Sequence, residues 1–268
     1  MFSKNYLKLK LFACHPDMEE KEFGKNFLEH WLSAEDDLRP EEFFFAEGVK
    51  KKFLVAELGI EGLVKEWPDN CSMFRRKNKP KLNGMIGYYH NNENVFTVFF
   101  SMGQNSEYMI KFFKLLFPLF KSYYGNIQSS KVIITRYEFT RKTDNYDSSH
   151  QYGDIISLYD YYGFGITIPQ ISWVNFLGKE LVERIGEDKF KTLTSYIIEK
   201  INDGYFIVTH PSHRFHGTPE GYAEEERIMQ HLGRHHFFDR NLVDQKSLWS
   251  DHSEELVQQI IDEKLNKN

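Results

Sequence analysis

The sequence predicts an α+β fold with largely antiparallel sheets packed against helices, because strands and helices alternate without a regular βαβ order. Residues 6–12 (YLKLKLF) alternate apolar and polar side chains, as a half-buried strand does. Two further strand-like runs, 85–89 and 95–100, flank the polar tip 90–94, which is typical of a β-hairpin. Pairing within such a hairpin is antiparallel, and this favours an antiparallel sheet.

Amphipathic segments lie between the strands, with apolar residues spaced as on one face of a helix. The first of them follows Asp17, a residue type that caps helix N-termini. Pro118 lies late in another and is expected to kink or shorten that helix, which ends at Gly125. The predicted helices are 18–34, 49–64, 107–123, 220–231 and 253–265.

The stretch 163–185 (GFGITIPQISWVNFLGKELVERI) is predicted to organise the C-terminal part of the core. Apolar residues alternate up to Pro169, which predicts a short strand that the proline ends. From Trp173 onward they recur every four positions, which predicts an amphipathic helix that begins at a buried tryptophan. A second helix is expected over 190–201, followed by a short strand over 205–208.

Composition excludes several classes of protein. Hydrophobic residues make up 41% of the chain and aromatic residues 16%, which suffices for a packed core and excludes a disordered chain. A net charge of −5 argues against a nucleic-acid partner, because such binders carry an excess of Lys and Arg. Cys14 and Cys71 form no CxxC pair, which is typical of reduced cytoplasmic thiols. No segment approaches the roughly 20 apolar residues of a membrane span. We therefore expect a cytoplasmic protein without a membrane partner.

A long polar stretch, 141–154, follows an expected strand at 132–139. Structureless connections of this length are uncommon inside a compact domain and are often functional. We expect one α+β domain over residues 1–268, in which halves 1–140 and 155–268 are joined by this polar loop.

Residues 67–84 are expected to form a loop with a basic run, RRKNKPK, at 75–81. Such a run could contact phosphate groups, act as a localisation signal or serve a nucleic-acid-binding regulator, or it could be a solvated connection. We favour the solvated connection, because no aromatic side chains interleave with the basic ones.

The histidines are the sharpest enzymatic signal, since seven of the eleven follow residue 209. His210, His213 and His216 are spaced three apart in an expected loop. His231 and His235 could share one helical face, as zinc ligands do, but the residues between them lack the glutamate of an HExxH motif. A metal-dependent hydrolase using this C-terminal cluster is the alternative function, and a hydrogen-bonding network explains the same residues.

Other catalytic patterns are weak. The chain contains no GxSxG or Walker motif, and neither cysteine has a recognisable base beside it. Asp144, Asp147, Asp154 and Asp160 could gather as a metal or acid–base cluster, although a solvated polar loop is the simpler interpretation. We therefore predict a protein that is not an enzyme and that needs no cofactor and no metal.

The segment 171–178 (ISWVNFLG) resembles the type VI secretion immunity proteins of bacterial polymorphic-toxin systems. That family carries a Trp–aromatic–Leu–Gly segment followed by a Gly-containing turn, here 185–187 (IGE), a helix and a short strand that ends in a polar, Pro-containing loop, here 205–211 (YFIVTHP). The resemblance covers about residues 163–232 and is only schematic before them; the His-rich part of the loop has no counterpart in the family.

The resemblance implies a non-enzymatic protein that binds a co-encoded toxin and blocks it, either at the toxin's active site or from elsewhere. Such binding relies on a few charged or aromatic anchors on a rigid scaffold. We place these anchors in loops 141–162 and 210–220. The predicted partner-binding residues are Asp144, Asp147, Asp154, Tyr159, Asp160, Tyr161, His213, Arg214, His216 and Glu220.

Overall fold

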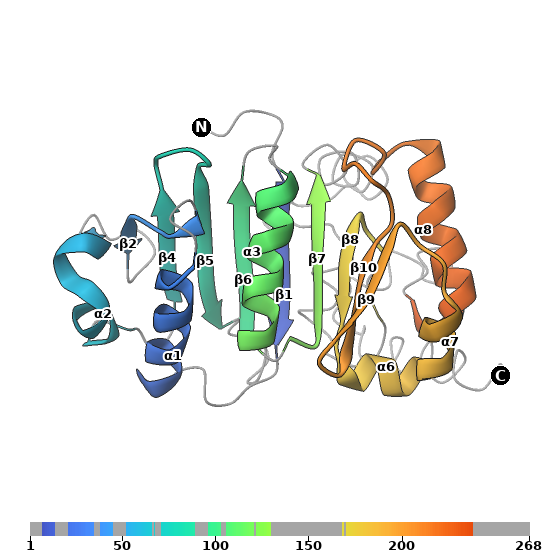
Figure 1. Cartoon of the computed structure of the whole chain (residues 1–268), viewed down its shortest axis with the longest axis horizontal. Helices are drawn as coiled ribbons and strands as arrows, with labels where there is room; N and C mark the ends of the chain where they lie inside the picture. Colours follow the sequence, from blue (N-terminus) through green and yellow to red (C-terminus); the bar gives the residue numbers. More distant parts are fainter. Residues whose placement is uncertain are drawn as a thin grey trace, which may run out of the picture.

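One antiparallel sheet runs through the described part of the chain, in the strand order β3-β2-β4-β5-β6-β1-β7-β8-β10-β9 (Figure 1). The structure is a computed structural model that describes residues 7–13, 21–34, 38–44, 52–65, 67, 71–88, 96–102, 106–120, 122–129, 168 and 170–237. Its fold class is α+β, as the sequence predicts.

The N-terminal strands are β1 (Leu7–Ala13), β2 (Glu42–Phe44), β3 (Phe53–Leu54), β4 (Cys71–Arg76), β5 (Leu82–Tyr88), β6 (Phe96–Met102) and β7 (Tyr124–Ser129). The C-terminal strands are β8 (Val174–Leu177), β9 (Ile197–Ile201) and β10 (Gly204–Val208). The helices are α1 (Lys21–Leu32), α2 (Val55–Lys65), α3 (Ser106–Leu119), α6 (Lys179–Ile185), α7 (Glu187–Thr192), α8 (Pro219–Leu232) and the 3-10 helix η3 (Arg234–His236).

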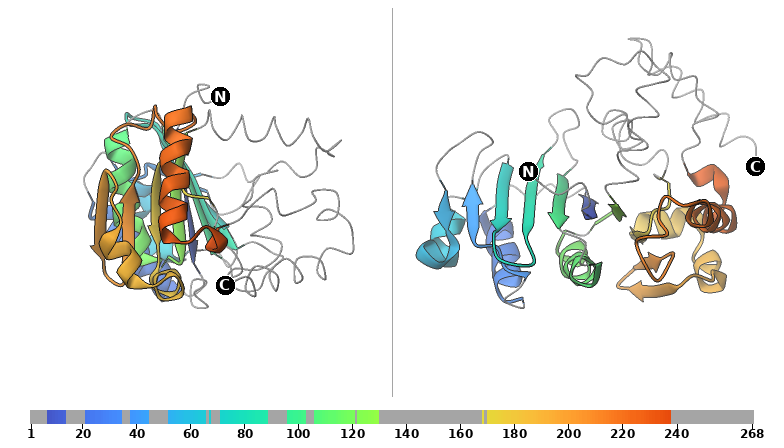
Figure 2. Two further views of the ribbon diagram at one scale, coloured as in Figure 1. Left: turned by 90° about the vertical axis from the view of Figure 1, so that its right-hand side faces the viewer. Right: turned by 90° about the horizontal axis from the view of Figure 1, so that it is seen from above.

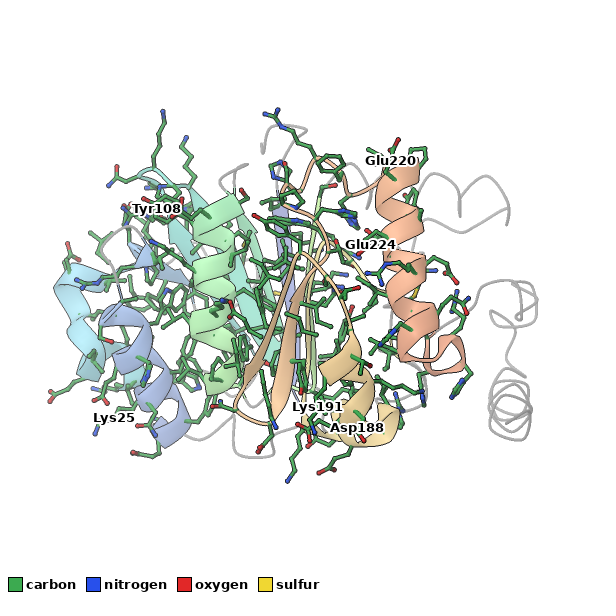
Figure 3. All side chains as sticks on the ribbon, turned by 45° about the vertical axis from the view of Figure 1, so that its right-hand side comes forward. Lys25, Tyr108, Asp188, Lys191, Glu220 and Glu224 are labelled. Atoms are coloured by element: carbon green, nitrogen blue, oxygen red, sulfur yellow. The ribbon has the colours of Figure 1, made fainter. Side chains whose placement is uncertain are left out.

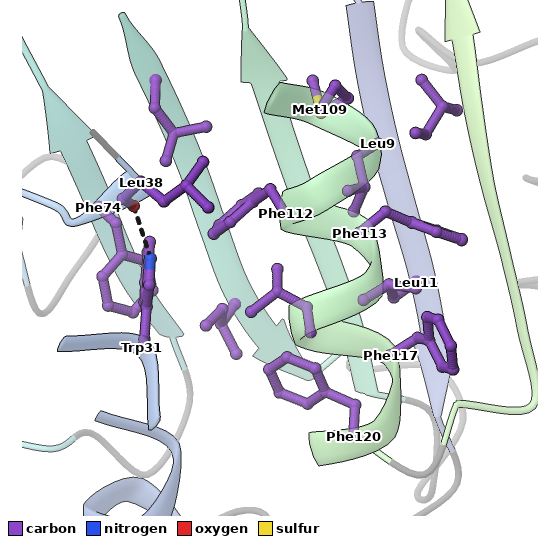
Figure 4. Packing of buried hydrophobic residues seen from close by; sticks show 14 of the residues in the cluster. Leu9, Leu11, Trp31, Leu38, Phe74, Met109, Phe112, Phe113, Phe117 and Phe120 are labelled. Atoms are coloured by element: carbon purple, nitrogen blue, oxygen red, sulfur yellow. Dashed lines mark hydrogen bonds between the residues drawn. The ribbon is translucent and has the colours of Figure 1, made fainter. Parts of the chain in front are cut away.

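Helices α1, α2 and α3 line one face of the sheet (Figure 2). Leu9 and Leu11 of β1 point at α3, whose Phe113 and Phe117 are fully buried against the sheet (Figure 4). Trp31 of α1 lies in the same cluster and donates its Nε1–H to a backbone oxygen of the next loop, at 2.9 Å. These residues belong to the larger of two hydrophobic clusters in the described part of the chain, which we call the first core.

A second core packs α6, α7 and α8 against the C-terminal strands. Ile207 of β10 belongs to this core, whereas its neighbours Phe206 and Val208 belong to the first one. Successive residues of a strand point to opposite faces. The two cores therefore lie on opposite faces of the same sheet.

The junction between the N-terminal and C-terminal strands is a regular ladder. Strand β7 pairs with β1 on one side and with β8 on the other, and Asn126 stands opposite Asn175. Gly178, just after β8, donates its N–H to the oxygen of Tyr123 at 2.8 Å. A Cβ at Gly178 would lie 2.5 Å from the oxygen of Ser122, so this close approach requires glycine.

Strand β1, helix α1, the β5–β6 hairpin and helix α8 agree with the sequence prediction. Helix α3 also agrees, but it ends at Leu119, and β7 begins at Tyr124, where the prediction had only the helix end. Helix α2 begins at Val55, after the short strand β3, instead of at residue 49, and Gly59 breaks it with a φ of 61°.

Three predictions were wrong. Residues 174–177 form strand β8, not the start of a helix; all four are buried, and a strand buried on both faces loses the alternation that identifies it. Residues 197–201 form strand β9, not the end of a helix; β9 pairs with β10, and Asn202, with a φ of 54°, lies in the turn between them. Residues 67–84 are not a loop, since most of them form the β4–β5 hairpin.

Several predicted segments lie outside the described residues. They are the helix cap at Asp17, the strands at 132–139 and 164–167, the polar loop 141–154 and the helix 253–265.

Candidate binding surface

The loop 209–218 connects β10 to α8 and contains three of the predicted binding residues, His213, Arg214 and His216, while Glu220 lies in the first turn of α8. It lies at the end of the sheet where β10 finishes and α8 begins, and Figure 3 marks this end of α8 with Glu220. Ser195, just before β9, donates its hydroxyl to the oxygen of Val208 at 2.8 Å. The start of β9 is thereby held at the same end of the molecule.

Trp173 fixes the first residues of this loop. Its Nε1–H donates to the oxygen of His210 at 2.9 Å, and its own oxygen accepts the N–H of Thr209 at 2.9 Å. The Thr209 hydroxyl donates to that oxygen as well, at 3.1 Å. Trp173 is buried, as the sequence predicts, and it serves the loop by holding its backbone.

Helix α8 fixes the other end of the loop. Thr218 caps the helix by accepting the N–H of Gly221 at its hydroxyl, at 3.1 Å, and Pro219 occupies the first turn. The backbone of Phe215 passes so close to Gly221 that a Cβ there would lie 2.1 Å from its oxygen. The loop is therefore packed directly onto the first turn of α8.

His216 is a support of the loop. Its ring is 1% exposed, and Nδ1 lies 2.5 Å from Oε1 of Glu225, which α8 contributes and which is equally buried. A buried carboxylate and imidazole that bond each other satisfy two polar groups that burial would otherwise penalise. The side chain of His216 is thus buried and not presented to solvent, and it supports the shape of the loop.

His213 is half-buried and lies edge-on to the indole of Trp173, with ring centroids 5.6 Å apart. Burial lowers the pKa of its imidazole, and the nearby Arg214 and His216 lower it further. The ring is consequently neutral at neutral pH, and one of its nitrogens can accept a hydrogen bond.

The side chains that this end of the molecule presents to solvent are aromatic and charged. Phe215 is 43% exposed, Tyr222 of α8 is 39% exposed and Tyr196, before β9, is 56% exposed. Arg214 and Glu220 are also exposed. We call these five residues and His213 the C-terminal binding surface: Tyr196, His213, Arg214, Phe215, Glu220 and Tyr222.

Three residues of this surface, Tyr196, Phe215 and Tyr222, were missing from the predicted binding residues. The sequence placed Tyr196 within a continuous helix, so its position at the loop end was hidden. Tyr222 follows the loop directly, and its place in the first turn of α8 could have been inferred from the helix cap at Thr218.

The structure does not place His231 and His235 on one helical face. Helix α8 ends at Leu232, and Gly233 follows with a φ of 103°. His231 instead lies with Nε2 2.9 Å from the oxygen of Lys189. No group of three His, Cys, Asp or Glu side chains that could hold a metal occurs among the described residues. The zinc-like spacing was therefore misleading.

His235 and His236 lie beyond that glycine with their rings 4.0 Å apart. Burial lowers the pKa of His236 to about 4, helped by His235 and by two nearby basic side chains, Arg184 and Lys189. The imidazole of His236 is therefore neutral at neutral pH.

The remaining predicted binding residues lie outside the described residues: Asp144, Asp147, Asp154, Tyr159, Asp160 and Tyr161. Within the part of the chain that the structure describes, no helix is both long and apolar enough to cross a membrane. Comparison with known protein families and with curated proteins finds no match.

Proposed function

We propose that this chain is an immunity protein that binds a cognate type VI secretion toxin and neutralises it by direct contact. The resemblance of residues 163–232 to such immunity proteins suggests the class. The C-terminal binding surface supports it, because exposed Arg and aromatic side chains are the residue types that dominate protein–protein interfaces.

The observation that carries the proposal is the contrast between the backbone and the side chains of loop 209–218. Trp173 and Gly221 hold its backbone at both ends, whereas Arg214 and Phe215 project into solvent. A loop that is ordered before binding loses little conformational entropy when a partner arrives. Exposed apolar area on such a loop is then available to stabilise a complex.

Neutralisation by this surface needs no cofactor. The partner is a toxin encoded beside this chain, and a cytoplasmic location follows from the need to protect the producing cell. Occlusion of the toxin's active site and binding at another position both agree with the proposal.

The decisive experiment is co-expression with the product of the adjacent open reading frame. We expect a stable one-to-one complex on size exclusion, and rescue of growth when both proteins are produced. Absence of a complex, with a neighbouring gene of metabolic function, would overturn the proposal.

Two variants test whether the C-terminal binding surface is the interface with the toxin. Arg214→Ala combined with Phe215→Ala should weaken the complex by about a hundredfold or more, as loss of two interface anchors does. Lys25→Ala on α1 removes an exposed cation from the opposite part of the sheet and should leave affinity unchanged. Equal affinity of both variants would place the interface elsewhere, even where the complex itself forms.

A further inference from the structure

The carboxylate of Glu42, on β2, is buried and surrounded by three basic side chains. Its Oε2 accepts the Nε–H and Nη2–H of Arg75, at 2.8 and 2.6 Å. Its Oε1 accepts from Nζ of Lys77 at 2.7 Å and from Nζ of Lys52 at 3.2 Å. We call these four residues the Glu42 cluster.

Sheet pairing brings the cluster together. Strand β2 lies between β3 and β4, and Glu42 stands directly opposite Arg75 in the β2–β4 register. Lys52 directly precedes β3 and Lys77 directly follows β4. The guanidinium of Arg75 also lies 4.9 Å from the centre of the Phe44 ring, which limits its freedom. The basic groups are thus positioned before any ligand binds.

Positive charge is in excess at this point. Among the described residues, three cations face the one carboxylate of this cluster, so two positive charges are in excess there. Glu41 does not offset them, because it lies 3.6 Å from Nη1 of Arg76 and accepts the backbone N–H of Lys77.

The effect of this charge shows at Glu42 itself. Burial would raise the pKa of the Glu42 carboxyl, but the hydrogen bonds from its three basic neighbours outweigh burial and lower the pKa to about 2. The site therefore stabilises negative charge strongly.

Donors remain available on the outer side of the cluster. The side chains of Lys52, Arg75 and Lys77 are 50%, 39% and 54% exposed, although each already bonds the buried carboxylate. An ammonium group has three N–H donors and a guanidinium has five, so each side chain keeps unused donors. The two lysines contact the same oxygen and hence lie close to each other.

We propose that the Glu42 cluster binds a phosphate-class dianion, either free phosphate or a small phosphate monoester. Its oxygens accept hydrogen bonds from the outer N–H groups of Lys52 and Lys77 and from the free edge of Arg75. A tetrahedral dianion matches the two excess positive charges and offers several acceptors to converging donors.

The geometry favours a small ligand over a nucleic-acid strand. Binding of single strands relies on exposed rings that stack on bases, and the aromatic ring in contact with the cluster, Phe44, lies against Arg75. The chain as a whole carries a net charge of −5, which does not favour a long polyanion. This site is independent of the C-terminal binding surface and does not rest on the proposed function.

The test is a titration of the full chain with inorganic phosphate, in which calorimetry measures binding in sodium chloride buffers of constant ionic strength. We expect saturable binding of one phosphate per chain. Lys52→Gln combined with Lys77→Gln should weaken it at least about tenfold, since the double variant removes two charge-assisted hydrogen bonds to the anion. Lys179→Gln, with an exposed lysine on α6, is the control and should bind as the wild type does.

A second variant separates a ligand site from a purely structural network. Glu42→Gln leaves three cations without their carboxylate, so phosphate should raise its melting temperature more than it raises that of the wild type. A merely structural network would leave both melting temperatures insensitive to phosphate at constant ionic strength, and this result would overturn the proposal.

Two further ligands identify the source of the phosphate group. Adenosine monophosphate that binds more tightly than inorganic phosphate indicates a monoester, and equal affinity indicates free phosphate. A single-stranded oligonucleotide that binds while both small ligands fail would overturn the proposal in favour of a nucleic-acid surface. Equal weakening by Lys179→Gln would also overturn it.

Discussion

Glu42 and Glu225 are both buried carboxylates, and they differ in what surrounds them. Glu225 pairs with the imidazole of His216 in the C-terminal part of the sheet. Glu42 meets three permanent cations near the opposite edge. A buried carboxylate with several cationic partners stays ionised to low pH. When it is finally protonated, the protein loses the stabilisation that those ion pairs contributed to the free energy of unfolding.

The depressed pKa of Glu42 predicts a specific pH window. Its folded pKa of about 2 lies below the ordinary value of 4.5, so its contribution to the free energy of unfolding is complete above pH 4.5 and is lost as pH falls toward 2. We expect about 2 kcal/mol, because water screens the half-exposed lysines and reduces what the full shift would give.

Chemical denaturation of the wild type and of Glu42→Gln between pH 7 and pH 2 measures this term. The difference in unfolding free energy should be largest at neutral pH and should shrink as pH falls to 2, where about half of the wild-type Glu42 carboxyls are protonated. A difference that does not change with pH would show that packing, and not charge, accounts for the effect of the substitution.

Two tryptophans perform the same task in separate elements. Trp31 of α1 donates Nε1–H to the oxygen of Leu38, and Trp173 before β8 donates to the oxygen of His210, each at 2.9 Å (Figure 4 shows the first). Replacing either by Phe should cost about 1–3 kcal/mol, because the buried carbonyl loses its donor.

Hydrogen exchange distinguishes the two variants. Trp173→Phe should accelerate exchange of the amides in loop 209–218 and weaken binding of the proposed toxin partner. Trp31→Phe, the matched control, should accelerate exchange only around residues 38–44 and leave binding intact. If Trp173→Phe alters stability without touching loop exchange, the indole bond does not order that loop.

The elements that sequence predicts well are those with one buried face. The apolar residues of β1 and α3 recur with a clear period, because they lie on the face that packs against the core and polar residues lie between them. Strand β8 has all four residues buried, so its apolar pattern fits a helix as well as a strand. Its identity depends on pairing with β7 and β10, which no local pattern contains.

The residues of the C-terminal binding surface also differ in whether a local sequence pattern could predict them. Arg214 and Glu220 could be named from sequence because polar loop residues before a helix are expected at the surface. Burial of His216 could not be foreseen, because it depends on Glu225, nine residues later in a helix whose register is set by packing. The Glu42 cluster was hidden as well, since the basic run was assigned to a loop and its acidic centre lies on another strand.

At the scale of the whole molecule, one sheet connects the N-terminal and C-terminal strands. Phe117 of α3 stacks on Phe176 of β8 with ring centroids 4.0 Å apart, and Phe113 meets Phe206 of β10 at 5.9 Å. The first core therefore contains residues from both parts of the chain. Contacts of this kind couple the unfolding of the parts that share them.

This shared core predicts one cooperative unfolding transition. Leu9→Ala in β1 and Ile207→Ala in β10 each leave a buried cavity, which costs about 2–5 kcal/mol. Leu9 belongs to the first core and Ile207 to the second, but the first core joins the N-terminal and C-terminal strands. Each variant should therefore move the whole transition, with circular dichroism and tryptophan fluorescence giving the same midpoint. Lys25→Ala, on the exposed side of α1, is the control and should leave the midpoint in place. Independent halves would instead give two transitions, and Ile207→Ala would then shift only one of them.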